Sequence, residues 1–216
     1  MADAHAGALH AHQFEDADQQ KDASTLGMWV FLLTEILFFG GMFLAYAVYR
    51  IAYPAAWAAA SHHLDVRLGG INTVVLIVSS LTMAMAVHAA QLGRRQQLVV
   101  FLILTMLLGG VFVGIKAVEY QHKFAEGHVP GPGFHFEGAD GRHAQLFFSL
   151  YFAMTGMHAL HMIIGFGLLA WLLAGSLKGR FTPSYYTPVE MIGLYWHFVD
   201  IVWIFLFPLL YLLGRH

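Results

Sequence analysis

The sequence predicts an all-α integral membrane protein, a five-transmembrane-helix bundle, and three observations lead to this fold class. Hydrophobic residues make up 58% of the 216-residue chain and charged residues only 11%, whereas a soluble domain usually carries about 25% charged residues. Five apolar stretches each reach the ~20 residues that a helix needs to cross a ~30 Å hydrocarbon core. The segments between them are too short to bury a core of their own. We therefore expect function to lie in the bundle or in what it binds.

A polar N-terminal tail over residues 1–25 precedes the predicted membrane domain over 26–216. The tail lacks the basic segment and short apolar run of a signal peptide. We interpret its histidines, His5, His10 and His12, as part of a solvated segment rather than as a metal site. Ser24 and Thr25 are predicted to cap the first helix. The predicted spans cover residues 26–49, 68–90, 97–118, 146–174 and 190–213.

Two features of the third span carry packing predictions. Gly110 and Gly114 are small residues four positions apart, a spacing that lets a neighbouring helix come close. Lys116, Glu119 and Lys123 follow at helical i+3 and i+4 spacings. We expect them to form an ion-pair set at the membrane interface, with both lysines extending toward water.

Composition excludes some kinds of chemistry. The chain has no cysteine, which excludes thiolate iron–sulfur sites, thioether-linked haem and thiolate copper sites. The net charge is −2 and no basic stripe exists, so nothing indicates binding to nucleic acid.

Charge alone determines orientation poorly. With the N-terminus in the cytoplasm, the positive-inside rule compares five basic residues on that side with six on the other. The short connector that contains Arg94 and Arg95 favours the cytoplasm for that side.

Glu35 is the most unusual polar residue within a predicted span. It lies in the middle of an apolar helix, on a face that it shares with Phe31 and Phe38. An ionised carboxylate is expensive at this depth, so Glu35 is expected to hold its proton or to find a donor on another helix. We interpret it as a proton-handling or partner-contacting group, and the alternative is a carboxyl that is hydrogen-bonded for packing.

The fourth span carries His158 and His161 on one face. Axial haem ligands must lie on opposite sides of the iron, which two residues one turn apart on one helix cannot do. A metal site would need a third ligand from elsewhere. Structural hydrogen bonding is therefore the preferred interpretation of both histidines, and no metal ligands or cofactor-binding residues are assigned.

The fifth span carries Glu190, His197 and Asp200 within one sector of its helical wheel. His197 and Asp200 are one turn apart and can hydrogen-bond to each other, which lowers the cost of burying both. Asn72 begins a matching mildly polar stripe on the second span. Together with Glu119, His158 and His161, these residues are predicted to form a structural polar seam between helices.

Five segments, in the same order, resemble the cytochrome c oxidase subunit III family. Residues 27–41 (GMWVFLLTEILFFGG) are similar to its glutamate-bearing helix, and Asn72-Thr73 and Glu119-Tyr120 resemble two of its dipeptides. The most specific similarities are TGMHALHMIIG over residues 155–165 and YWHFVDIVW over residues 195–203. The resemblance covers nearly the whole chain past residue 25.

The resemblance implies a non-catalytic role. Members of the family pack on subunit I, which holds the haem and copper centres, and they support sustained proton-coupled oxygen reduction and bind phospholipid. Subunit II and small subunits are further expected partners. The expected location is a bacterial-type inner membrane, with the N-terminus cytoplasmic and the C-terminus periplasmic or external. Long members have seven helices, of which the first two, one arm of a lipid-holding cleft, are expected to be missing here.

Three alternatives stay open. The chain is also compatible with the equivalent subunit of a quinol oxidase or of a nitric oxide reductase, because other subunits bind the electron donor. A small proton-coupled transporter would suit Glu35, His197 and Asp200 as a relay, but the odd helix count and the lack of an internal repeat disfavour it. A cytochrome would use His158 or His161.

Overall fold

The computed structural model describes residues 14–136 and 141–213, and helices make up nearly all of this part of the chain. The elements are α1 (Ala17–Ala52), α2 (Pro54–His62), α3 (Val66–Gln91), α4 (Arg95–Ala125), α5 (Gly141–Leu177), α6 (Thr187–Phe207) and the π-helix η2 (Pro208–Leu212). Five helices, the last of them α6 continued by η2, are long and apolar enough to cross a membrane. The predicted fold class is therefore confirmed. The tail histidines and Arg215 lie outside the described residues.

The first helix begins earlier than predicted. Asp16 is its N-cap, and the Asp16 side chain accepts a hydrogen bond from the backbone N–H of Gln19. The hydroxyls of Ser24 and Thr25 donate instead to carbonyls four residues earlier inside the helix. Their predicted capping role is wrong because Asp16 starts the helix first, and the Ala, Gln and Lys residues that follow are good helix formers.

A short helix, α2, lies in the connector between the first two predicted spans. Pro54 lies in its first turn, where proline needs no hydrogen-bonded N–H. Trp57 is buried, and its ring lies edge-on to that of Phe147 on α5, with 5.7 Å between centroids. This contact anchors α2 across the end of the bundle.

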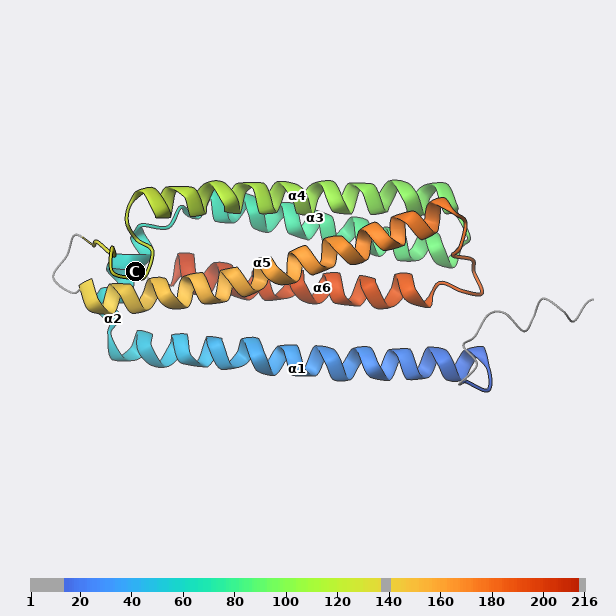
Figure 1. Ribbon diagram of the computed structural model, residues 1–216, viewed down its shortest axis with the longest axis horizontal. Coiled ribbons are helices and arrows are strands. Elements are labelled where there is room, and N and C mark those ends of the chain that lie inside the picture. Colours follow the sequence, from blue (N-terminus) through green and yellow to red (C-terminus); the bar gives the residue numbers. More distant parts are fainter. Residues whose placement is uncertain (1–13, 137–140, 214–216) are drawn as a thin grey trace, which may run out of the picture.

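Helices α3 and α4 run side by side, α5 crosses the bundle obliquely next to α6, and α1 lies along the outside (Figure 1). The start of α1, the α3–α4 connector and the α5–α6 connector share one end of the bundle. At the other end lie α2 and the segment that joins α4 to α5. The two ends of the bundle are thus formed by different connecting segments.

Tryptophan and glycine determine how closely the inner helices approach. A Cβ on Gly109 of α4 or on Gly165 of α5 would lie 2.9 Å from the ring of Trp196 on α6. Both positions must therefore stay glycine to admit the indole. Gly110 and Gly114 pack against no helix within residues 14–136 and 141–213, since a Cβ on either would have no neighbouring atom within 4 Å there. The helical phase of α4 points Gly109 inward instead.

Candidate functional site

Glu35 and His161 form a polar pair between α1 and α5. The Glu35 Oε2 atom lies 3.1 Å from His161 Nε2, and both side chains are mostly buried. The other ring nitrogen, Nδ1, lies 2.8 Å from the carbonyl oxygen of Met157. The Tyr195 hydroxyl of α6 donates to the His161 carbonyl at 2.9 Å. Three helices therefore fix the geometry of this pair.

This geometry determines how many protons the pair holds. A carbonyl oxygen can only accept, so Nδ1 of His161 must carry a proton and donate to Met157. The contact between Nε2 and Glu35 then needs one further proton, which resides on the carboxyl group or on Nε2. In a low-dielectric interior the uncharged arrangement, with Glu35 donating to His161, avoids separating charge. The pair can therefore keep a proton within the membrane without a net charge.

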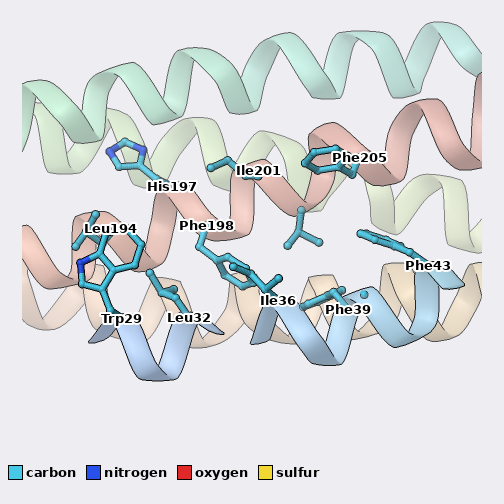
Figure 2. A pocket seen from close by; sticks show the side chains of 12 residues that line it. Trp29, Leu32, Ile36, Phe39, Phe43, Leu194, His197, Phe198, Ile201 and Phe205 are labelled. Carbon is cyan, nitrogen blue, oxygen red and sulfur yellow. The ribbon is translucent and has the colours of Figure 1, made fainter. Parts of the chain in front are cut away.

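A groove runs between α1 and α6 (Figure 2), and Phe39 in its wall lies against the His161 ring, with 5.3 Å between centroids. Its volume is about 470 Å³, within the range of protein ligand sites. Almost all of its walls are apolar, and His197 is the single ionisable side chain among those that line it. The wall residues are Trp29, Leu32, Ile36, Phe39, Gly40 and Phe43 from α1, with Leu194, His197, Phe198, Ile201, Val202 and Phe205 from α6. Such a groove suits an alkyl chain.

A buried ion pair lies between α4, α5 and η2. Lys116 and Glu119 of α4 are only 7% and 3% exposed, and Lys116 Nζ lies 2.9 Å from Glu119 Oε2. The Tyr151 hydroxyl of α5 donates to Glu119 Oε1 at 2.8 Å. Tyr211 of η2 also donates to this carboxylate, and it accepts from Lys116 at 2.7 Å. The four side chains tie α4, α5 and the chain end together.

The structure corrects the prediction that Lys116 and Lys123 extend to water. Lys116 instead turns inward, where the rings of Tyr120, Tyr151, Trp203 and Tyr211 surround its ammonium at 5.0–5.7 Å. Lys123 is also buried; it donates to the His63 carbonyl and pairs with Glu126 rather than with Glu119.

Polar side chains do join α3 to α6, but not through all of the predicted contacts. Trp203 Nε1 donates to Thr73 Oγ1 at 3.1 Å, and Ser80 Oγ lies 2.6 Å from His197 Nδ1. The expected hydrogen bond between His197 and Asp200 is absent from the described structure. Because His197 Nδ1 hydrogen-bonds to Ser80 of α3, the imidazole ring is held toward α3.

Two further predicted residues have incomplete hydrogen bonding within residues 14–136 and 141–213. Asn72 Nδ2 donates weakly to the Phe112 carbonyl at 3.5 Å, so Asn72 faces α4, and its Oδ1 has no partner there. Glu190 Oε2 is likewise buried without a partner. Neither residue forms a chemical centre with His197 or with Glu119.

His158 contradicts the prediction of structural hydrogen bonding. Both ring nitrogens are buried and have no hydrogen-bond partner among the described residues. The imidazole instead packs against the rings of Phe112 and Trp203, each with 5.4 Å between centroids. Across the same part of the chain, no three His, Cys, Asp or Glu side chains are grouped so that they could hold a metal ion.

Glu126 and His128 follow the membrane span of α4 and form a polar cluster in the connector between α4 and α5. The connector is called closed when these contacts are made. Burial lowers the pKa of His128, although the hydrogen bond from its Nδ1 to Glu126 at 2.9 Å opposes this shift. Burial also raises the pKa of Glu126, but Lys123 and His128 outweigh it, so that the net pKa of Glu126 is lowered. The His128 ring stacks on Phe148 of α5 at 4.9 Å. Both titratable groups thus resist protonation in the closed connector.

Acidification is expected to loosen this connector. The open segment binds more protons than the closed one once the pH falls below the ordinary His128 pKa of 6.5, and Glu126 adds to this below its ordinary pKa of 4.5. Stability of the closed form is therefore retained at pH 7 and lost progressively toward pH 4. Hydrogen-exchange protection of the backbone amides over 127–135 should fall accordingly. In Glu126→Gln, protection should start lower, and the further loss of protection below pH 4.5 should be reduced because no carboxylate takes up a proton there; an unchanged pH profile would contradict the assignment.

Sequence reasoning did not identify Tyr151, Tyr211 or Ser80 as parts of polar sites. Each contacts its charged partner across a helix–helix interface, and only the i+3 spacing of Lys116 and Glu119 was visible in the sequence. Both tyrosines lie in otherwise apolar segments. Because a buried phenol hydroxyl usually has a hydrogen-bond partner, their presence there could have indicated a polar group on a neighbouring helix.

Comparison with known proteins identifies the family. The family model described as "Cytochrome c oxidase subunit III" matches residues 9–215. A cytochrome bo(3) ubiquinol oxidase subunit 3 of Pseudomonas aeruginosa is 30% identical over 99% of this chain and 95% of its own length. A cytochrome c oxidase subunit 3 of Corynebacterium diphtheriae is 33% identical over 87% of this chain and 86% of its own. A cytochrome c oxidase subunit 3 of Gallus gallus is 34% identical over 87% of this chain and 69% of its own length.

The five sequence segments and the five spanning helices agree with this match, which confirms the resemblance described above. Matched relatives include subunits of both cytochrome c and quinol oxidases, which are multi-subunit membrane complexes. The chain is therefore an integral membrane protein that belongs to the cytochrome c oxidase subunit III family of haem-copper oxidases.

Proposed function

We propose that this chain is the non-catalytic subunit III of a proton-pumping terminal oxidase. In this role it packs on subunit I, whose haem and copper centres reduce oxygen, and it supports sustained proton-coupled turnover. The observation that carries the proposal is the family match over nearly the whole chain. The internal chemistry agrees with it, because Lys116, Glu119 and His161 are engaged in contacts within the bundle.

The α1–α6 groove supports a lipid-binding role within this function. Its apolar walls and open side favour an acyl chain of a phospholipid over a polar substrate. Phe39, which lines the groove, packs against the His161 ring. A lipid at this place would fill the space between α1 and α6 and hold α1 against the bundle.

We also propose that the N-terminus is cytoplasmic. Lys21, Arg94, Arg95, Lys178 and Arg180 lie at the end that contains the start of α1 and both short connectors. At the other end, Lys116 and Lys123 are buried in ion pairs with Glu119 and Glu126. The short connector with Arg94 and Arg95 is the densest basic segment, and the positive-inside rule favours the cytoplasm for the end that contains it.

The electron donor has two candidates. Relatives are named as subunits of cytochrome c oxidases and of quinol oxidases, and the Pseudomonas aeruginosa ubiquinol oxidase subunit matches over almost its whole length. We propose a cytochrome c oxidase and hold the quinol oxidase as the second candidate. The presence of copper in subunit II of the purified complex would select the first, and its absence the second.

Purification of the chain from its native membrane should test the proposed function directly. Subunits I and II should co-purify with it. Native mass spectrometry should show phospholipid retained on the complex. The separated chain should be colourless and carry no stoichiometric haem or copper. Recovery of a haem-bearing chain, or of the chain alone, would contradict the proposal.

A further inference from the structure

Asp200 occupies an unusual position in α6. It is only 2% exposed, and neither carboxylate oxygen has a hydrogen-bond partner among residues 14–136 and 141–213. A buried acid without a partner is strongly unfavourable, whether charged or neutral. Neighbouring Ser80 lies near this carboxyl group, but its short contact, at 2.6 Å, is with His197 Nδ1. The folded chain therefore presents an unsatisfied acceptor within its own bundle.

The carboxyl faces a cavity between α3 and α6 of about 380 Å³. Ser80 and His197 also line this cavity, and the rest of its wall is apolar. Its rim is formed by exposed residues, among them Ile77, Leu81 and Ile201, which are 50%, 61% and 50% exposed. Asp200 can therefore be reached from outside the bundle, across a face of two helices that no described segment covers.

Depth in the membrane limits what can reach Asp200. The residue lies near the middle of the span Thr187–Leu212, about 15 Å from either edge of the hydrocarbon core. Phospholipid headgroups stay at those edges, and acyl chains carry no hydrogen-bond donor. A donor at this depth comes from the side chain of another membrane-spanning protein segment.

The α3 side of the cavity is suited to such a segment. Ser80 and Ala84 lie four residues apart and both line the cavity, which is the small-residue spacing that permits close approach of a second helix. Leu81 and Ile204 flank the polar groups and provide apolar contact area. This surface thus combines small residues, which allow a second helix to approach closely, with a buried hydrogen-bond acceptor.

We propose that this α3–α6 face is the docking surface for a transmembrane helix of another oxidase subunit, which inserts a hydrogen-bond donor against Asp200. The donor is a hydroxyl, amide, indole or basic side chain. The proposal rests on the assembly role proposed above and adds which face makes the contact and which residue specifies it.

Photo-cross-linking in the intact complex tests which face is used. A benzophenone amino acid at Leu81 should give an adduct with another oxidase subunit after illumination. Leu107 of α4 supplies a matched control, because it is also a leucine that is 61% exposed in the interior of its span. Adducts from Leu107 but not from Leu81 in an assembled complex would overturn the docking proposal and leave the assembly role intact. An adduct with a second copy of this chain would also overturn it.

Substitution of Asp200 tests the proposed hydrogen bond. Asp200→Leu should lower retention of the chain on the purified oxidase about tenfold during a detergent titration. Asp200→Asn keeps an acceptor oxygen and should stay within about twofold of the unsubstituted chain. Equal retention of both variants would overturn the role of Asp200. If Asp200→Leu fails to insert, the Leu81 cross-link in the otherwise unsubstituted chain still decides between the two outcomes.

Discussion

Replacing Lys116 with methionine is expected to destabilise the folded chain by about 3–5 kcal/mol, the usual consequence of removing one partner from a buried ion pair. Glu119 would remain 3% exposed, with only the Tyr151 and Tyr211 hydroxyls to stabilise its charge. The methionine would also lose the contacts that the ammonium makes with the surrounding rings. Thermal unfolding of the purified protein in detergent should show the loss as a lowered midpoint.

Two comparisons make this prediction specific. Lys178→Met removes the same side chain from an exposed connector and should change the midpoint little. The double variant Lys116→Met with Glu119→Leu removes both charges and should recover part of the lost stability, since an apolar replacement of a whole buried pair is often neutral. If Lys116→Met unfolds like Lys178→Met, the ion pair does not hold α4 to the chain end.

The sequence is sufficient to predict the five spans and their order, because hydropathy and length are properties of contiguous residues. It does not determine helix phase. Gly109 rather than Gly110 meets Trp196, which is a difference of one position and about 100° of rotation around α4. The chain end is a second feature that the sequence does not determine. The π-helix η2 begins at Pro208, and its Tyr211 accepts a hydrogen bond from Lys116. Neither outcome follows from a pattern within a single helix.

Partner choice for the intramembrane polar residues was equally difficult to predict. The i+3 spacing correctly indicated the contact between Lys116 and Glu119 but also suggested one between His197 and Asp200, which the structure does not form. His197 Nδ1 instead hydrogen-bonds to Ser80, which lies on another helix. Residue spacing gives the candidates within one helix, and the bundle then decides which of them meet.

Glu35 is expected to carry a proton near neutral pH and to affect the durability of the oxidase rather than its elementary redox step. His161 Nδ1 donates to the Met157 carbonyl, and the uncharged arrangement, in which a protonated Glu35 donates to His161 Nε2, avoids separating charge in the low-dielectric interior. Infrared difference spectra should show the carbonyl stretch of a protonated carboxylic acid that disappears in Glu35→Gln. A carboxylate signal from Glu35 at pH 7 would place the proton on His161 instead.

Two substitutions separate the hydrogen bond from the proton. The amide N–H of Glu35→Gln can still donate to His161 Nε2, so this variant should remain close to the unsubstituted chain in stability and initial turnover. Glu35→Ala leaves Nε2 unsatisfied in a mostly buried site, at about 1–3 kcal/mol. The complex that contains it should start at normal rate and inactivate sooner during sustained turnover. An immediate and complete loss of turnover in Glu35→Gln would instead assign the carboxyl proton to the reaction itself.

A hydrophobic carbodiimide gives an independent chemical test of the same site. Such reagents attack protonated carboxyl groups in apolar surroundings. The Glu35 side chain is 19% exposed, whereas Asp200 is 2% exposed. Glu35 should therefore be modified first. Because modification blocks donation to His161, the modified complex should show the shortened working life of Glu35→Ala rather than the behaviour of Glu35→Gln.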